Sequence, residues 1–362
     1  MIALAGLTSE VLAGAPRWGC KISSWLGSTF LRDVPIVSGK LTSKTTTDVL
    51  HTLSITVRRF DHGFDWRPGS DPLHPLARYG QELDVSVLVG SAVSDQVWTV
   101  RKARVLITDW DDDDNGNVVV TGESRLRRIK DDRPAVPLVP ATGGTLASEA
   151  LRILPPGMGL AVDATLADRA VPSTMVWGTD RLAALQDIAT AWPALLRVDT
   201  WGQIVMAAPL PQVPTPVLTL TDGKGGTVVA VPRSDTRSGS ANRIVARSSA
   251  SGAEDVQAVA EQATGPMAVT GPYGAVTTEW SSPLLGNVAQ AQAAAATMLA
   301  RSLVSAAILP VVHAPDPRLE LDDPVAVVRR GEPLWGWVTG TELPLTVSDI
   351  GSGQRTDVGV GT

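Results

Sequence analysis

The stretch QELDVSVLVG, residues 81–90, decides the fold class. Apolar side chains stand at every second position from Leu83 to Val89, with polar residues between the first three. A period of two places these side chains on one face of a β-strand. The same alternation occurs from Leu53 to Val57. The first third of the chain is therefore expected to be rich in β-structure.

Two further strands are expected on either side of an acidic turn. Residues Trp98 to Ile107 and Val118 to Val120 bracket the stretch from Asp111 to Asn117. The Asn-Gly pair at 115–116 favours the positive φ angles of a tight reversal. The turn begins like a calcium loop, but glycine stands twelfth, where such a loop needs glutamate. A solvated hairpin tip is the simpler interpretation.

A long excursion from the sheet is expected between Asp61 and Leu76, which is rich in Pro and Gly. Long loops of this kind usually have a function, so an interface is proposed here. Large aromatic side chains often carry the binding energy of interfaces, and Trp66 is expected to be exposed for this reason. The candidate interface residues are Phe64, Trp66, Arg67, His74 and Tyr79.

Proline-rich stretches divide the chain. The first lies at 134–140, and the second contains Pro211, Pro214 and Pro216. We predict an α+β, mainly β protein with two β-barrel-like domains around a small mixed one. The predicted domains are a β-rich barrel-like domain at 1–135, a mixed α/β domain at 136–212, and a second β-rich barrel-like domain at 213–362 with one long Ala-rich helix.

Local signals predict the elements of the last two thirds. Helices are expected at Thr145 to Leu154 and at Arg181 to Trp192, the second capped by Thr179 or Asp180. A hairpin is expected from Leu195 to Met206. The remaining expected elements are strands from about Val217 and at Val228 to Val231 around the Gly-rich turn Asp222 to Gly226, a strand at Asn242 to Arg247, a helix at Asn287 to Ala307, and strands at Leu309 to Val312, Val325 to Arg329, Leu334 to Thr339 and Leu345 to Ser348.

Composition excludes several classes of function. Lys and Arg total 31 against 37 Asp and Glu, a net charge of −6, so a surface that binds nucleic acid is not expected. The single cysteine, Cys20, cannot form an internal disulfide and is expected to be a small buried residue in a protein that folds in a reducing cytosol. No signal peptide and no membrane span are expected, because the start lacks a basic region and polar residues interrupt the apolar stretch near 288–309.

Motifs for catalysis or cofactor binding are not apparent. The histidines, His51, His62, His74 and His313, do not have the spacing of a metal site. His62 and His74 share the long loop with several aspartates, but solvated loop residues are the simpler interpretation. No cofactor, metal or catalytic residue is expected, and a binding or assembly role is favoured.

Several short sequence segments, which we call phrases, resemble one known family when taken in their order along the chain. They are Leu73 to Val85, Val97 to Val100, Val118 to Lys130, Trp177 with Arg181 to Trp192, Asp199 to Gly202, Ser240 to Ala246, and Pro315 to Val325, where Asp322 stands at a position usually held by glycine. Together they are similar to minor tail proteins of siphophages that infect actinobacteria. Through these they resemble the tail-hub family, which includes the baseplate hubs of contractile-tailed phages. The phrases span roughly residues 40 to 350.

The resemblance implies a structural virion protein without catalytic residues. Three subunits, each with two barrel-like domains, would form a homotrimeric ring that joins the sixfold tail tube to a threefold tip. DNA would only pass through its channel. Implied partners are the distal tail protein, the tape-measure protein and other tail-tip proteins, and the location would be the tail tip, assembled in the host cytoplasm.

Two alternatives belong to other classes. A receptor- or carbohydrate-binding tip protein would use exposed aromatic side chains to stack on sugars. A tail-associated peptidoglycan hydrolase would need a carboxylate pair or a Cys/His pair in a cleft, which one cysteine and four scattered histidines do not favour.

Overall fold

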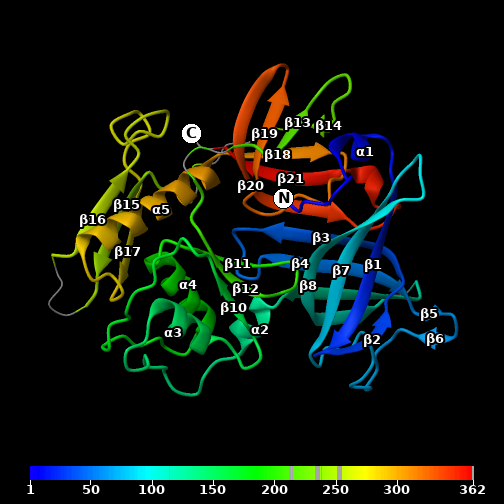
Figure 1. Cartoon of the computed structure of the whole chain (residues 1–362), viewed down its shortest axis with the longest axis horizontal. Coiled ribbons are helices and arrows are strands. Elements are labelled where there is room, and N and C mark those ends of the chain that lie inside the picture. Colours follow the sequence, from blue (N-terminus) through cyan, green and yellow to red (C-terminus); the bar gives the residue numbers. More distant parts are fainter. Residues whose placement is uncertain are drawn as a thin grey trace.

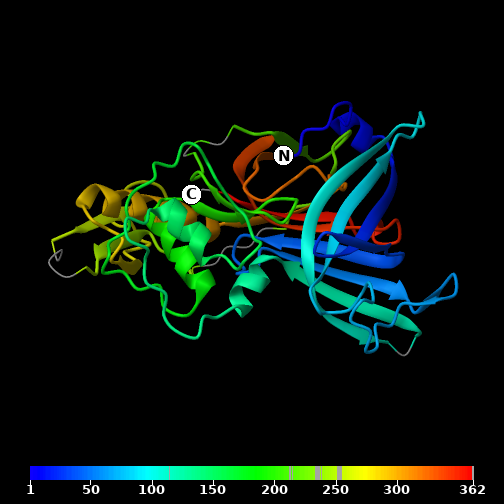
Figure 2. The ribbon, with the colours of Figure 1, turned by 60° about the horizontal axis from the view of Figure 1, so that its bottom comes forward.

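The computed structural model describes residues 1–360 except 114, 212, 214, 233–236, 238 and 251–254. The described chain is mainly β (Figure 1), as predicted, with one large sheet, two three-stranded sheets and a short two-stranded ribbon. The large sheet and its loops lie on one side of the molecule. The longer helices lie on the other side with the two small sheets (Figures 1 and 2).

The large sheet has thirteen strands in the order β14-β18-β21-β20-β3-β4-β9-β8-β7-β1-β2, and β13 and β19 extend it beside β20. All of its strand pairs are antiparallel except β13 with β19. Its strands are β1 (Arg17–Leu26), β2 (Thr29–Asp33), β3 (Ile36–Lys44), β4 (His51–Arg58), β7 (Gln81–Gly90), β8 (Val97–Asp112), β9 (Asn117–Ser124), β13 (Leu218–Thr221), β14 (Val228–Ala230), β18 (Ile308–His313), β19 (Pro324–Arg329), β20 (Glu332–Pro344) and β21 (Gln354–Gly359).

Strands from both ends of the chain meet in this sheet, where β20 pairs with β3 and Leu343 lies opposite Leu41. In the described residues, the two ends of the strand path, β14 and β2, are not paired with each other, so no closed barrel is present. The barrel-like form of the predicted domains is therefore not confirmed. The predicted domain boundaries stay a prediction.

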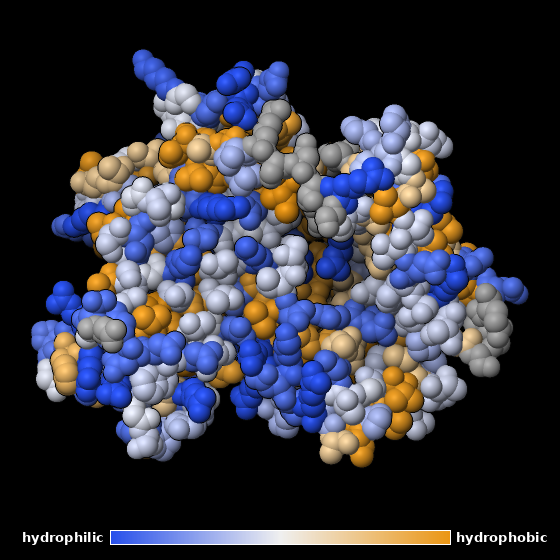
Figure 3. All heavy atoms as spheres, turned by 180° about the vertical axis from the view of Figure 1, so that it is seen from behind, coloured by the Kyte–Doolittle hydropathy of each residue, from blue (hydrophilic) through white to orange (hydrophobic). Residues whose placement is uncertain are grey.

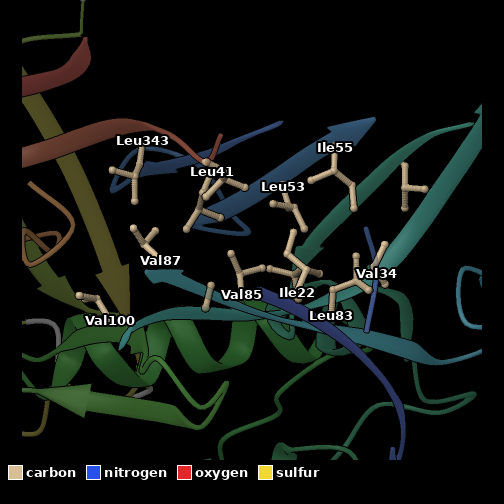
Figure 4. Packing of buried hydrophobic residues seen from close by; sticks show 14 of the residues in the cluster. Ile22, Val34, Leu41, Leu53, Ile55, Leu83, Val85, Val87, Val100 and Leu343 are labelled. Atoms are coloured by element: carbon tan, nitrogen blue, oxygen red, sulfur yellow. The ribbon is translucent and has the colours of Figure 1, made fainter. Parts of the chain in front are cut away.

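The alternating side chains of β7 lie in the main core. Leu83, Val85, Val87 and Val89 are fully buried, and they pack with residues of β1, β3 and β4 (Figure 4). Because a register slip of one residue would turn this whole row to the opposite face, the buried row fixes the register of the sheet. The prediction of half-buried strands here is confirmed.

Capped helices form the middle of the chain. The Thr145 side chain caps α3 (Leu146–Ile153) in a capping box with Ser148, and Asp180 caps α4 (Arg181–Ala191) by accepting a hydrogen bond from Ala183 N at 2.9 Å. Both helices are confirmed. A helix not predicted, α2 (Leu126–Asp131), precedes them. The accompanying sheet contains β10 (Leu160–Val162), β11 (Leu195–Val198) and β12 (Ile204–Ala207), in which β11 and β12 form the predicted hairpin.

The Ala-rich helix α5 (Val288–Ala306) covers one face of the second small sheet, as its composition suggests. Ala291, Ala294 and Ala295 are fully buried in a cluster with Ala246 and other small side chains of that sheet, which lets helix and sheet approach closely. Asn287 caps the helix. The sheet consists of β15 (Arg243–Ser248), β16 (Gln257–Glu261) and β17 (Thr277–Ser282).

Several local predictions are wrong. Residues 345–348 are not a strand, because β20 ends at Pro344 and the chain then turns, with Leu345 buried and Val347 exposed. The Gly-rich turn at 222–226 does not join a hairpin, since β13 pairs with β19 and β14 pairs with β18. Strand β8 also runs further than predicted, through Asp112.

The turn between β8 and β9 differs in detail from its prediction. Gly116 has a positive φ of 76°, but Asn115 does not. The Asp113 carboxylate accepts hydrogen bonds from the backbone N–H groups of Asn115 and Asn117 at 2.9 and 2.7 Å, so it closes the turn itself. Asp114 lies outside the described residues.

Short elements complete the described chain: α1 (Ser9–Ala13) and the 3₁₀ turn η1 (Ile350–Ser352). None of the helices in the described part is both long and apolar enough to cross a membrane.

Candidate interaction surface

The predicted excursion leaves the large sheet at the side away from α3, α4 and α5 (Figures 1 and 2). It begins with a ribbon of β5 (Phe60–Asp61) and β6 (Phe64–Asp65), which turns at His62 and Gly63 with φ angles of 46° and 78°. Backbone hydrogen bonds tie the ribbon to its base, including one from Trp66 N to Arg59 O at 2.7 Å. The excursion is therefore an ordered structure.

Aromatic rings pack together beneath this loop. Phe64 stacks on His74 with ring centroids 5.3 Å apart, and Trp66 meets Phe64 edge-to-face at 4.9 Å. Trp66 is only 2% exposed and belongs to the main core. The prediction that Trp66 is exposed is wrong, because the loop folds back and buries its largest apolar ring.

His74 is a structural residue. Its Nδ1 accepts a hydrogen bond from Leu76 N at 3.1 Å, so Nε2 carries the proton and donates to the carbonyl of Asp65 at 3.0 Å. Both ring nitrogens of the buried side chain are thus used within the loop. His62, by contrast, has a 95% exposed side chain beside Asp61, so the two histidines do not form one cluster.

Side chains of the sheet fasten the far end of the loop. Gln81 Nε2 donates to the carbonyls of Pro72 and His74 at 2.6 and 3.2 Å, and Ser24 Oγ donates to the carbonyl of Pro75 at 2.5 Å. A loop held in this way loses little further entropy when it binds a partner.

The outer side of the loop exposes large side chains. Phe60, Leu73 and Tyr79 are 64%, 63% and 57% exposed. Arg67 and Arg78 are exposed beside them, and Arg67 lies 3.4 Å from Asp112 on the neighbouring turn. Aromatic residues and arginine are enriched at interfaces. We refer to Phe60, Arg67, Leu73, Arg78 and Tyr79 as the loop surface.

A small pocket of about 250 Å³ opens between the loop and β8. A β-bulge between Ile107 and Asp109 interrupts the β8–β9 ladder here, and such bulges redirect the side chains that follow. Asp109 and Trp110 thereby join the loop residues at the pocket. Neither residue can be recognised from the alternation of the sequence, because the bulge shifts which side chains lie on each face. The lining residues are Pro68, Gly69, Ala77, Arg78, Tyr79, Asp109 and Trp110.

A larger cleft of about 1500 Å³ lies between the large sheet and the half of the molecule that contains α5. Figure 3 shows a hollow between these two parts on the rear face. Its lining includes the turn at 45–48, Trp335 of β20 and part of α5. The ion pair between Arg197 and Asp322 also lines it.

The single thiol of the chain, that of Cys20, is held mainly in its protonated form. Burial raises the pKa of the Cys20 thiol to about 11, with Asp349 adding to the effect, so little nucleophilic thiolate is present near neutral pH. Cys20 packs against the main core but is only partly buried, so the expectation of a buried residue is met in part. In the described ranges, no three His, Cys, Asp or Glu side chains form a group that could hold a metal ion.

The fold of this chain is similar to that of several solved structures. No protein-family model and no curated protein matches the chain. Among solved structures, a tail protein from Neisseria meningitidis MC58 is similar with a TM-score of 0.62 and 14% identity, covering 95% of this chain and 97% of its own. The 43 kDa tail protein of prophage MuSo2 from Shewanella oneidensis is similar with a TM-score of 0.61 and 14% identity, covering 94% of this chain and 98% of its own. Prophage tail protein gp18 from Listeria monocytogenes EGD-e has a TM-score of 0.53 and 9% identity, and the match covers 93% of this chain and 94% of its own. The chain has the fold of these tail proteins along nearly its whole length.

Proposed function

We propose that this chain is a structural component of a phage tail and forms the hub of the tail tip. Three copies would make a ring that joins the tail tube to the distal tip and leaves a channel for DNA. Its partners would be the distal tail protein, the tape-measure protein and host-contacting tip proteins. The resemblance of its sequence phrases to minor tail proteins favours an actinobacterial siphophage as the source.

One observation carries the proposal. The structural likeness to the tail proteins from Neisseria and Shewanella covers at least 94% of each chain. Because nearly all of both chains is covered, the likeness extends to the entire arrangement of sheets and helices. A single shared domain would cover only part of each chain. Function does not follow from fold alone, so the proposal also draws on the order of the sequence phrases and on the surfaces described above.

The open sheet supports assembly. Its path ends in two strands, β2 and β14, whose outer edges are unpaired in the described chain. Exposed strand edges are liable to pair with other chains, and proteins usually cover them. Phe30 on β2 is 49% exposed, although large apolar side chains on an edge favour aggregation. In a ring, neighbouring subunits would cover these edges.

The experiment is to measure the mass of the purified protein by light scattering and to image the same fraction by negative-stain electron microscopy. The proposal predicts three times the chain mass of 38.0 kDa and particles with a central hole. A monomer that stays monomeric after the distal tail protein is added would contradict the hub. Larger assemblies without threefold symmetry would also contradict it.

A further inference from the structure

The small pocket beside the loop surface presents two aromatic rings and two opposite charges. Tyr79 comes from the loop and is 57% exposed, while Trp110 comes from β8 and its ring packs partly against the main core. Arg78 and Asp109 also line the pocket. The loop and the strand together thus build one concave site.

The two charged groups are free to bind a ligand. Within the described part of the chain, the side chains of Arg78 and Asp109 have no hydrogen-bond or ion-pair partner, although the backbone of Asp109 pairs with Thr121 in the sheet. Two other carboxylates nearby are engaged: Asp112 lies within ion-pair distance of Arg59 and Arg67, and Asp113 closes the turn. The pocket therefore offers one free donor group and one free acceptor group, and its net charge is zero.

We infer that this pocket binds a single pyranose ring of a neutral saccharide. The C–H faces of a sugar ring pack on aromatic rings, while its hydroxyls both donate and accept hydrogen bonds. Asp109 would accept from hydroxyls and Arg78 would donate to them, and hydrogen bonds to charged groups are the stronger kind. The volume of about 250 Å³ is below the range of pockets that enclose drug-sized ligands, so it suits one ring.

Other ligand classes use the pocket less well. An anion would meet the Asp109 carboxylate, and a cation would meet the Arg78 guanidinium. An apolar side chain of a partner protein would contact Tyr79 and Trp110 but would desolvate both charged groups without replacing their hydrogen bonds. A neutral ring that carries hydroxyl groups satisfies all four side chains.

The binding would give the proposed tail protein direct contact with sugars on a host surface. It goes beyond a structural role and does not depend on ring formation, because all lining residues belong to one chain. If three copies form a ring, three weak sites would act together and raise the avidity for a surface rich in sugars.

The test is saturation-transfer NMR of the full chain with methyl glycosides of glucose, galactose and N-acetylglucosamine, and with sialic acid as an anionic comparison. We expect millimolar binding of at least one neutral glycoside. Tyr79→Ala and Asp109→Asn should each weaken it about tenfold, the loss typical of a charged hydrogen bond or an aromatic stack. Asp111→Asn is the matched control, since Asp111 lies on the same strand outside the pocket.

Unfolding midpoints of the variants must stay at the wild-type value, which separates loss of binding from loss of fold. The inference is overturned if none of the neutral glycosides binds, if sialic acid binds more tightly than all of them, or if Tyr79→Ala and Asp109→Asn bind as the wild type does. Equal weakening by Asp111→Asn would also overturn it, because the effect would then follow surface charge and not the pocket.

Discussion

Arg197 on β11 donates two hydrogen bonds to the carboxylate of Asp322, one of them from Nη2 to Oδ1 at 3.0 Å. Both side chains are largely buried, at 15% and 18% exposure. Asp322 has a φ of 67°, a left-handed conformation that suits glycine. The carboxylate links the turn before β19 to β11, which gives a structural reason for an aspartate at this left-handed position.

Substitutions of Asp322 should separate strain from pairing. Asp322→Ala removes the ion pair and keeps the left-handed strain, so we expect a loss of about 2–3 kcal/mol in the free energy of unfolding. Asp322→Gly removes the pair but relieves the strain, and its loss should be about 1 kcal/mol smaller. Urea unfolding followed by Trp fluorescence measures both. A glycine variant less stable than the alanine variant would contradict this explanation.

His51 should make stability depend on pH. Burial, together with the nearby positive charge of Lys102, lowers the pKa of His51 to about 4, and its Nδ1 lies 2.7 Å from Ser43 Oγ. The unfolded chain takes up the proton near pH 6.5, whereas the folded chain stays neutral until about pH 4. The contribution of neutral His51 to the free energy of unfolding is therefore fully present above pH 6.5. It falls by about 2–3 kcal/mol as the pH drops toward 4.

Urea unfolding at several pH values checks this expectation. His51→Gln should flatten the slope between pH 6.5 and 4, and burial lowers the pKa of His313 as well, so part of the slope should remain. His62→Gln is the control, because its side chain is 95% exposed. An unchanged slope in His51→Gln would show that His51 does not titrate as described.

Glu82 should be a sensitive position in the large sheet. Its carboxylate, 5% exposed, accepts hydrogen bonds from Arg104 Nε and Arg125 Nη2, each at 2.6 Å. Glu82→Gln leaves two guanidinium groups without their carboxylate, and we expect a loss of about 3 kcal/mol or more. Glu342→Gln breaks an exposed pair with Lys40 and should cost less than about 1 kcal/mol. Similar losses in the two variants, measured by urea unfolding, would contradict the importance given to burial.

The loop should have a stabilising inner side and a replaceable outer side. Trp66→Ala removes a buried ring from the main core, and we expect a loss of about 3–5 kcal/mol. Tyr79→Ala changes an exposed side chain and should alter the free energy of unfolding by less than about 0.5 kcal/mol. Thermal unfolding compares the two variants. Equal effects would mean that the loop does not pack as described.

Cys20 should react slowly with iodoacetamide in the folded protein. Its pKa of about 11 leaves far less thiolate at pH 8 than a free thiol has, so alkylation should be slower by a factor of about a hundred or more. Unfolding in guanidinium chloride should restore the normal rate. Mass spectrometry of samples taken over time gives both rates, and rapid labelling of the folded chain would contradict the burial of this thiol.

The sequence predicts what depends on neighbouring residues. The alternation from Leu83 to Val89 predicts β7, and the polar side chains at Thr145, Asp180 and Asn287 mark the starts of helices. These signals act within a few residues, so they can be recognised before the chain is folded. Strand β1 does not follow this alternation, because three successive residues, 22–24, are buried, so its sequence does not reveal it.

Contacts between distant residues could not be predicted. The pairing of Leu41 with Leu343 and that of Arg197 with Asp322 depend on how the whole chain folds. The burial of Trp66 likewise follows from the loop folding back on the sheet, since its neighbours along the chain resemble those of an exposed residue. The pocket needs Tyr79 from the loop and Asp109 from beyond a bulge, and no spacing rule connects them.

The central claim is that this chain is a structural part of the tail tip. The most direct measurement is immunogold electron microscopy of purified particles of the phage that encodes this chain, with antibodies raised against the chain. The proposal predicts label at one position, the distal end of the tail. Particles that carry no label, or label spread along the tube or on the capsid, would contradict it.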